Sequence, residues 1–172
     1  DEDKMDLIGV INSDEKINEH IKREFDKSKL KKYELVFLST GDGALEFLNF
    51  DLPEIVIINF NDPDIDIGRL ADQVENDSWL HSFGIIGLYN PDKANEEELL
   101  KKYKGLNILA VLDYFRMVSH IVKSVEIIDQ NRQIIFQKEL SDKLTGGAAG
   151  SFLIENDPLA VSIYSSIAAI SL

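Results

Sequence analysis

Cysteine is absent from all 172 residues, and its absence removes three kinds of chemistry. Without a thiol the chain has no disulfide bond, no thiolate ligand for a metal ion and no cysteine nucleophile. This composition is compatible with a reducing compartment, and we expect a cytoplasmic location.

Positive charge is scarce, because 18 lysine and arginine residues face 31 aspartate and glutamate residues, for a net charge of −13. Nucleic acids and anionic membranes are bound through basic surfaces, so neither is an expected partner. The apolar runs are far shorter than the roughly 20 residues that cross a bilayer. The start, Asp1 to Lys4, lacks the basic and then apolar order of an export signal. Cationic or neutral partners are favoured.

Motifs that carry catalysis or bind metals are also missing. The histidines stand in separate predicted elements without a partnering carboxylate motif: His20, His81 and His120. The alternating Asp62, Asp64 and Asp66 lack the central glycine and terminal glutamate of a calcium loop. We therefore predict no metal ion, no cofactor and no enzymatic activity.

The most informative stretch that is present runs from Leu52 to Gly68, with the sequence LPEIVIINFNDPDIDIG. Its segment Glu54 to Ile58 contains four β-branched apolar residues, which predicts a strand buried on both faces. A polar loop from Asn59 to Asp66 follows. Because ligands of open parallel sheets collect beyond the carboxyl ends of the strands, Asn59 occupies the position that determines the chemistry.

Short apolar runs alternate with amphipathic segments over the first 125 residues. The expected strands are Leu7–Ile11, Glu34–Leu38, Glu54–Ile58, Phe83–Leu88 and Asn107–Leu112. Helix starts are indicated by Asp14 and by Thr40, each in a polar cluster directly after a predicted strand. This alternation predicts an α/β fold, in which a doubly wound parallel sheet carries helices on both faces through right-handed crossovers.

A different pattern begins near Tyr114. Apolar residues lie three, four, three and seven residues apart, at Val118, Ile121, Val125, Ile128 and Ile135. The spacing predicts a long fifth helix that projects from the domain toward Leu144, and Arg132 interrupts its apolar seam. We interpret this segment as a short coiled coil or a packed helix extension. Dimerisation through the seam is the favoured interpretation, so a homodimer is expected.

Glycines divide the end of the chain from the rest. The segment Gly146 to Gly150 ends the predicted helix and provides a hinge. Beyond it, a strand at Ser151–Ile154 and an apolar helix at Leu159–Leu172 are too little for a core of their own. This tail packs on the first domain, packs on a symmetry mate or begins a second domain. The predicted division is 1–125, a domain; 126–150, a linker helix and hinge; and 151–172, an incomplete segment.

Two stretches carry a resemblance to a known family. The sequence GDGALEFL from Gly41 to Leu48 and the sequence PEIVIIN from Pro53 to Asn59 resemble the receiver domains of bacterial two-component response regulators. Pro63 stands where that family has its loop proline. The resemblance covers about Asp6 to Val125 and implies a flavodoxin-like (βα)5 fold with the strand order 2-1-3-4-5.

The resemblance also implies which positions carry the family's chemistry. Receivers hold magnesium with an acidic pair after the first strand, where this chain has Asn12 and Ser13. Neutral amide and hydroxyl groups cannot supply the charge that a hard cation prefers. The phosphoacceptor aspartate is matched by Asn59, whose amide cannot form an acyl phosphate because it lacks the carboxylate nucleophile.

The remaining two family positions are changed as well. The switch serine or threonine after the fourth strand is matched by Tyr89, and the lysine after the fifth strand by Asp113 or Tyr114. Neither of the last two can neutralise a phosphate, and an aspartate would repel it. The resemblance therefore implies a degenerate pseudo-receiver, a phosphorylation-independent signalling module that acts through protein contacts and dimerisation of the linker helix.

Two alternatives remain open. If the alignment slips, Asp14, Asp62 or Asp64 becomes the phosphoacceptor of an active phosphorelay receiver. A domain that binds a small ligand near Asn12, Asn59 and Tyr89 is a further possibility.

A fainter resemblance concerns the tail. Ser151 to Pro158 and the helix from Leu159 resemble the first strand and helix of the anti-sigma type of histidine-kinase-like ATPase, which implies the truncated start of a C-terminal output domain. None of the ATP-binding motifs of that family is present in this segment.

Overall fold

The computed structural model describes residues 6–28, 32–77, 83–115 and 118–131. Several predictions lie outside these residues: the helix beyond Asn131, its seam residue Ile135, the Gly146–Gly150 hinge and the tail from Ser151 to Leu172.

A parallel sheet of five strands forms the centre of the molecule, in the order β2-β1-β3-β4-β5. The strands are β1 (Asp6–Ile11), β2 (Tyr33–Leu38), β3 (Ile55–Asn59), β4 (Gly84–Tyr89) and β5 (Ile108–Asp113). Every residue of β3 is buried, as predicted for a central strand covered on both faces. The predicted flavodoxin-like fold and its strand order are confirmed.

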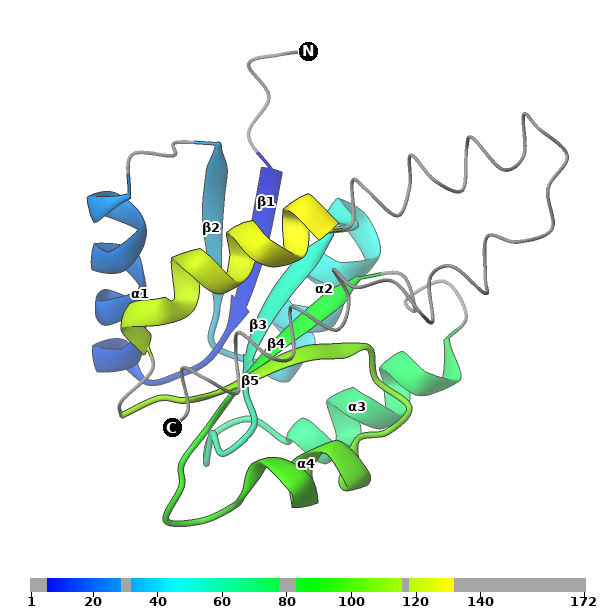
Figure 1. Cartoon of the computed structure of the whole chain (residues 1–172). Helices are drawn as coiled ribbons and strands as arrows, with labels where there is room; N and C mark the ends of the chain where they lie inside the picture. The colour runs from blue at the N-terminus through cyan, green and yellow to red at the C-terminus, as the bar shows by residue number, and fades with distance from the viewer. Residues whose placement is uncertain (1–5, 29–31, 78–82, 116–117, 132–172) are drawn as a thin grey trace, which may run out of the picture.

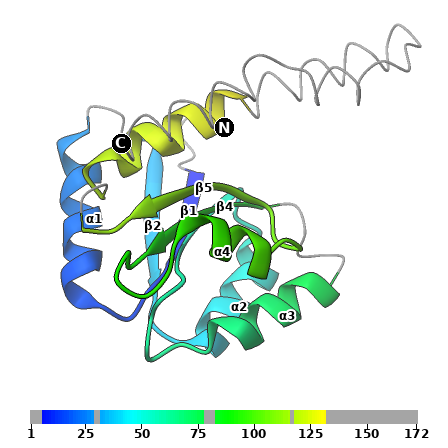
Figure 2. The same ribbon diagram turned by 60° about the horizontal axis from the view of Figure 1, so that its bottom comes forward.

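Helices cover both faces of the sheet (Figures 1 and 2). The helices on one face are α2 (Gly41–Asp51), α3 (Ile67–Asn76) and α4 (Glu96–Lys102), which contribute to one apolar cluster. On the other face, α1 (Glu15–Lys27) and a helix over residues 121–131 contribute to a second cluster. Asp14 and Thr40 cap α1 and α2 with their side-chain oxygens, as their positions in the sequence predict.

The helix over residues 121–131, drawn in yellow in Figure 1, follows the short 3₁₀ helix η2 (Val118–His120) and packs on the sheet. Val118, Ile121, Val125 and Ile128 are no more than 1% exposed and belong to the cluster that contains Ile8, Val10 and Ile57. These four side chains are covered by their own chain, so they are not available to another copy. Their assignment to a dimer seam is therefore corrected: they are core residues. Ile128, which belongs to this core, lies three residues past 125, the predicted end of the first domain.

Candidate functional site

The carboxyl ends of the strands place the predicted site residues at one edge of the sheet. Asn12 follows β1, Asn59 ends β3, and Tyr89 and Asp113 end β4 and β5 as paired residues. Ligands of parallel α/β domains bind at this edge of the sheet, and the residues matched to the functional positions of receivers lie at the same edge.

Asn12 and Asn59 are in direct contact. Asn12 is fully buried and Asn59 is 3% exposed. The Nδ2 atom of Asn59 donates to Oδ1 of Asn12 at 2.9 Å. In turn, Nδ2 of Asn12 donates to Oδ1 of Asn18 and to the carbonyl of Asp14, both at 2.9 Å. An amide carries both a donor and an acceptor, so these buried side chains satisfy one another without an ion.

The chain of hydrogen bonds continues across the edge. Oδ1 of Asn59 accepts from the backbone N–H of Asn61 at 3.0 Å, and Oδ1 of Asn61 accepts from the N–H of Asn90 at 2.6 Å. The Asn90 side chain is hydrogen-bonded to the hydroxyl of Tyr114. One neutral network, which we call the asparagine network, therefore links Asn18 in α1 to the residue that follows β5.

Tyr114 ends this network in a partly desolvated setting. Burial raises the pKa of its hydroxyl, and the negative charges of Asp14, Asp92 and Asp113 act in the same direction. The hydrogen bond from Asn90 opposes them by lowering this pKa. At neutral pH Tyr114 is thus held as a neutral hydrogen-bonding group.

Three members of the asparagine network were missed by the sequence reasoning, namely Asn18, Asn61 and Asn90. A recurrent pattern was available, because Asn12, Asn59 and Asn90 each stand at the end of a strand or directly after it. The spacing gives no indication of which backbone N–H each side chain binds.

Ser13 has a different partner from Asn12. Its N–H and its hydroxyl donate to the Asp62 carboxylate at 2.5 and 2.6 Å. The N–H of Asp64 donates to the same carboxylate at 2.9 Å. Asp62 is 6% exposed, so its charge is stabilised by these donors and joins the loop after β1 to the loop after β3.

The positions that match the family's switch residue and lysine lie side by side. Tyr89 is half-buried, and its carbonyl accepts from the N–H of Tyr114 at 3.1 Å. Asp113 is 1% exposed, and its Oδ1 accepts from the N–H of Phe115 at 2.8 Å. No positive charge stands at either position, so a phosphate would meet a carboxylate here.

A cavity of about 180 Å³ lies beside this edge, between the first turns of α2 and α3. Thr40, Asp42, Asp64, Asp66 and Arg69 contribute to its lining, whereas Asn12, Asn59 and Tyr89 do not. The cavity therefore does not coincide with the position expected for a small ligand.

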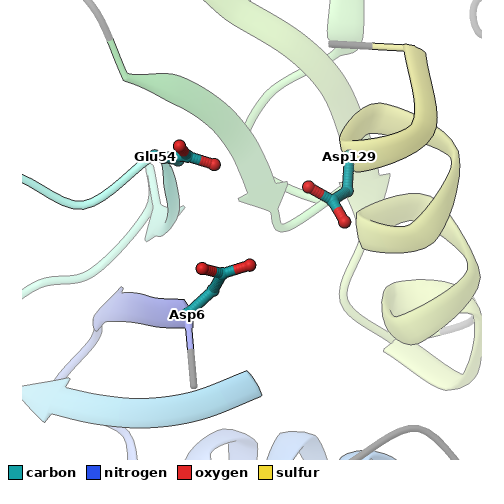
Figure 3. A group of neighbouring side chains, drawn as sticks. All are labelled: Asp6, Glu54 and Asp129. Carbon is teal, nitrogen blue, oxygen red and sulfur yellow. The ribbon is translucent and has the colours of Figure 1, made fainter. Parts of the chain in front are cut away.

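At the opposite edge of the sheet, three carboxylates converge (Figure 3). Oxygen atoms of Asp6, Glu54 and Asp129 lie within 4.8 Å of one another, and this is the one such group in residues 6–28, 32–77, 83–115 and 118–131. Asp129 already accepts hydrogen bonds from Nζ of Lys32 at 2.7 Å and from the hydroxyl of Tyr33 at 2.9 Å. The ammonium group of Lys32 is thus a cation that the chain itself supplies to this cluster.

These contacts shift the pKa values of both donors, Lys32 and Tyr33. The hydrogen bond to Asp129 raises the pKa of Lys32 above its ordinary value, against the opposing effect of burial. Burial, with the hydrogen bond to Asp129, raises the pKa of Tyr33 to about 12. Lys32 is therefore charged and Tyr33 neutral over the whole physiological range.

None of the helices in the described residues combines the length and the apolar character that a membrane span requires.

No family model and no curated protein matches this sequence. Solved structures do match. The chemotaxis response regulator CheY4 of Vibrio cholerae is 15% identical, with a TM-score of 0.58 over 72% of this chain and 98% of that one. A two-component response regulator from Legionella pneumophila is 22% identical, with a TM-score of 0.52 over 70% of this chain and 99% of that one.

The Mn²⁺-bound form of response regulator Rcp1 is 18% identical, with a TM-score of 0.55 over 67% of this chain and 91% of that one. Because each of these structures is covered almost completely, the similarity extends over a whole domain. The chain thus has the fold of response-regulator receiver domains, as the two sequence stretches predict.

Proposed function

We propose that residues 6–131 form a pseudo-receiver, a signalling module of response-regulator type that works without phosphorylation and without enzymatic activity. The observation that carries this proposal is the buried hydrogen bond of 2.9 Å from Nδ2 of Asn59 to Oδ1 of Asn12. Two carboxylates at these positions would repel each other and need a cation between them. Two amides bind each other directly and leave no unpaired charge.

The same atoms argue against phosphoryl transfer. An acyl phosphate forms when a carboxylate oxygen attacks phosphorus, and Asn59 presents an amide instead. Its Nδ2 and Oδ1 are both engaged in hydrogen bonds, which a phosphoryl group would have to break. The amides of Asn12 and Asn59 also lack the charge that holds Mg²⁺ in phosphoryl transfer.

The carboxylates of two nearby aspartates, Asp62 and Asp14, are already engaged in hydrogen bonds. Asp62 accepts hydrogen bonds from Ser13 and Asp64 through both carboxylate oxygens. Asp14 is occupied as the cap of α1, where Oδ1 accepts from the N–H of Lys16 at 2.9 Å. An acyl phosphate on either carboxylate would replace a charged acceptor oxygen that these donors bind.

Signalling then depends on protein contacts rather than on phosphate. The asparagine network reaches Tyr114, and η2 and the helix over residues 121–131 follow it in the chain. A partner that binds the domain changes the output by changing the pose of this helix. Protein partners, a homodimer and a C-terminal output domain belong to the proposal, and the net charge of −13 favours cationic or neutral partner surfaces.

The test is intact-mass spectrometry of the folded full chain after incubation with acetyl phosphate and Mg²⁺. We expect no gain of about 80 Da, the mass of one phosphoryl group. A response regulator that accepts phosphate from this donor, treated in parallel, shows that the reagent is active.

A gain of about 80 Da would overturn the proposal and favour the active phosphorelay receiver. The Asp14→Asn, Asp62→Asn and Asp64→Asn variants then identify the acceptor, since the variant that loses the gain has lost the reacting carboxylate.

A further inference from the structure

The last described turn of the helix over residues 121–131, which we call the helix end, is joined to the start of β2 by a charged contact. Oδ2 of Asp129 accepts from Nζ of Lys32 at 2.7 Å and from the hydroxyl of Tyr33 at 2.9 Å. The Asp129 side chain is 5% exposed and the Lys32 side chain is 45% exposed. A buried carboxylate thus depends on a donor that solvent and other molecules can reach.

The contact between Asp129, Lys32 and Tyr33 fixes an orientation of the helix that apolar packing alone does not fix. Ile121, Val125 and Ile128 bury the helix against the sheet through apolar side chains, which attract one another without regard to orientation. A buried carboxylate, in contrast, is strongly unfavourable unless its partners stay in place. Asp129 therefore fixes the position of the helix end relative to Lys32 and Tyr33.

The surroundings make this contact sensitive to the charge of Lys32. Asp6 and Glu54 place exposed carboxylates close to that of Asp129, with oxygen atoms of all three within 4.8 Å (Figure 3). Like charges at such distances repel each other, and Lys32 is the cation bonded to Asp129. If the charge of Lys32 is removed, the buried carboxylate of Asp129 loses the cation bonded to it, which is strongly unfavourable.

We propose that Lys32, Tyr33 and Asp129 form a latch that holds residues 128–131 of this helix on the sheet and that opens when the charge of Lys32 is removed or drawn away. Opening lets residues 128–131 leave the sheet while the strands keep their pairing. The latch itself is independent of the proposed function. Only the statement that the helix controls an output rests on that function.

Hydrogen–deuterium exchange of the full chain, read by mass spectrometry, tests this latch. In Lys32→Met we expect the amides of residues 128–131 to exchange about tenfold faster, because local opening of the helix end becomes easier. The amides of β3 keep their protection. Lys32→Arg retains the charge and stays within about twofold of the unmodified chain.

Two further variants make the test specific. Lys27→Met removes a lysine that pairs with Glu24 at 3.5 Å on the surface of α1, and it leaves the exchange of residues 128–131 unchanged. In Lys32→Met with Asp129→Asn, the neutral amide no longer needs a cation and still accepts from Tyr33. Most of the lost protection therefore returns in this double variant.

Two outcomes would overturn the latch. In one, exchange at residues 128–131 is the same in Lys32→Met as in the unmodified chain. In the other, exchange rises equally in all elements, which would mean that Lys32 only stabilises the whole fold. Phosphate uptake plays no part in either readout, so the proposed function and the latch fail independently.

Discussion

Asn12 and Asn59 each differ from aspartate by one side-chain group, and that group decides the direction of their hydrogen bond. Nδ2 of Asn59 is the donor and Oδ1 of Asn12 the acceptor, at 2.9 Å. A carboxylate has only acceptors at neutral pH, so aspartate at position 59 would bring two acceptors together in a buried place. The pair is stable because both residues are amides.

The variant Asn59→Asp is therefore expected to be less stable by about 1–3 kcal/mol at neutral pH, the cost of a buried polar group that loses its partner. Facing an acceptor raises the pKa of the new carboxyl in the folded state. The loss is then present at neutral pH and disappears as the pH falls below the unfolded pKa of about 4, where both states are protonated. Urea unfolding at several pH values measures this.

Asn95→Asp is the matched control for this prediction. Asn95 is exposed and caps α4, and aspartate caps helices about as well as asparagine. It is expected to change stability by no more than about 0.5 kcal/mol. Equal unfolding midpoints for Asn59→Asp and the unmodified chain would contradict the role given to the Asn12–Asn59 hydrogen bond.

The sequence predicts where the site residues lie, but it does not predict all the hydrogen bonds between them. The strand pattern and the family resemblance place Asn12, Asn59 and Tyr114 at one edge, and the structure has them there. The links through Asn61 and Asn90 depend on backbone N–H groups in loops. Hydrophobic periodicity carries no information on those groups, and it does not encode the direction of a hydrogen bond.

The positions of the strands were predicted better than the surface against which the helix over residues 121–131 packs. β3 was expected at Glu54–Ile58 and is found at Ile55–Asn59, a shift of one residue. A run of β-branched residues flanked by polar ones marks a strand strongly. Apolar residues three and four apart mark only a helix face, which packs equally well on its own sheet or on a second chain. The burial of Ile121 and Val125 identifies the sheet as the partner.

Truncation of this helix face is accordingly expected to weaken the fold. Ile121 is fully buried, and Ile121→Ala should lower the free energy of unfolding by about 2–5 kcal/mol, through lost apolar contact and a residual cavity. Urea unfolding followed by circular dichroism measures the loss. Lys123→Ala, at an exposed position of the same helix, should stay within about 0.5 kcal/mol.

A role of Ile121 in dimerisation would give a different result. The variant would then lose self-association at low protein concentration while its unfolding midpoint stayed that of the unmodified chain.

Polar contacts at the two edges of the sheet lie near the two ends of the described helix over residues 121–131. The asparagine network ends at Tyr114, just before η2, and the latch binds Asp129 near the last described turn. The network is neutral and its members are buried or half-buried, whereas the latch includes Lys32, whose side chain is 45% exposed. The latch therefore presents a charged group to solvent at the edge of the sheet opposite to the asparagine network.

The proposed homodimer must use surfaces other than the four buried core residues. Ile135 is the one member of the predicted seam outside the described residues, and Ile135→Glu is expected to shift a dimer of the full chain toward monomer with no change in the unfolding midpoint. Gln130→Glu adds the same charge at an exposed position of the helix and is expected to leave the dimer intact. Sedimentation velocity distinguishes these outcomes.

Net charge supplies an independent check on the same dimer. Each chain carries −13, so two copies repel each other, and salt shortens the range of that repulsion from about 10 Å at 0.1 M to about 3 Å at 1 M. A dimer held by apolar contacts should therefore tighten as salt is added. A dimer held by ion pairs weakens under the same conditions, and a chain that sediments as a monomer throughout has no seam at Ile135.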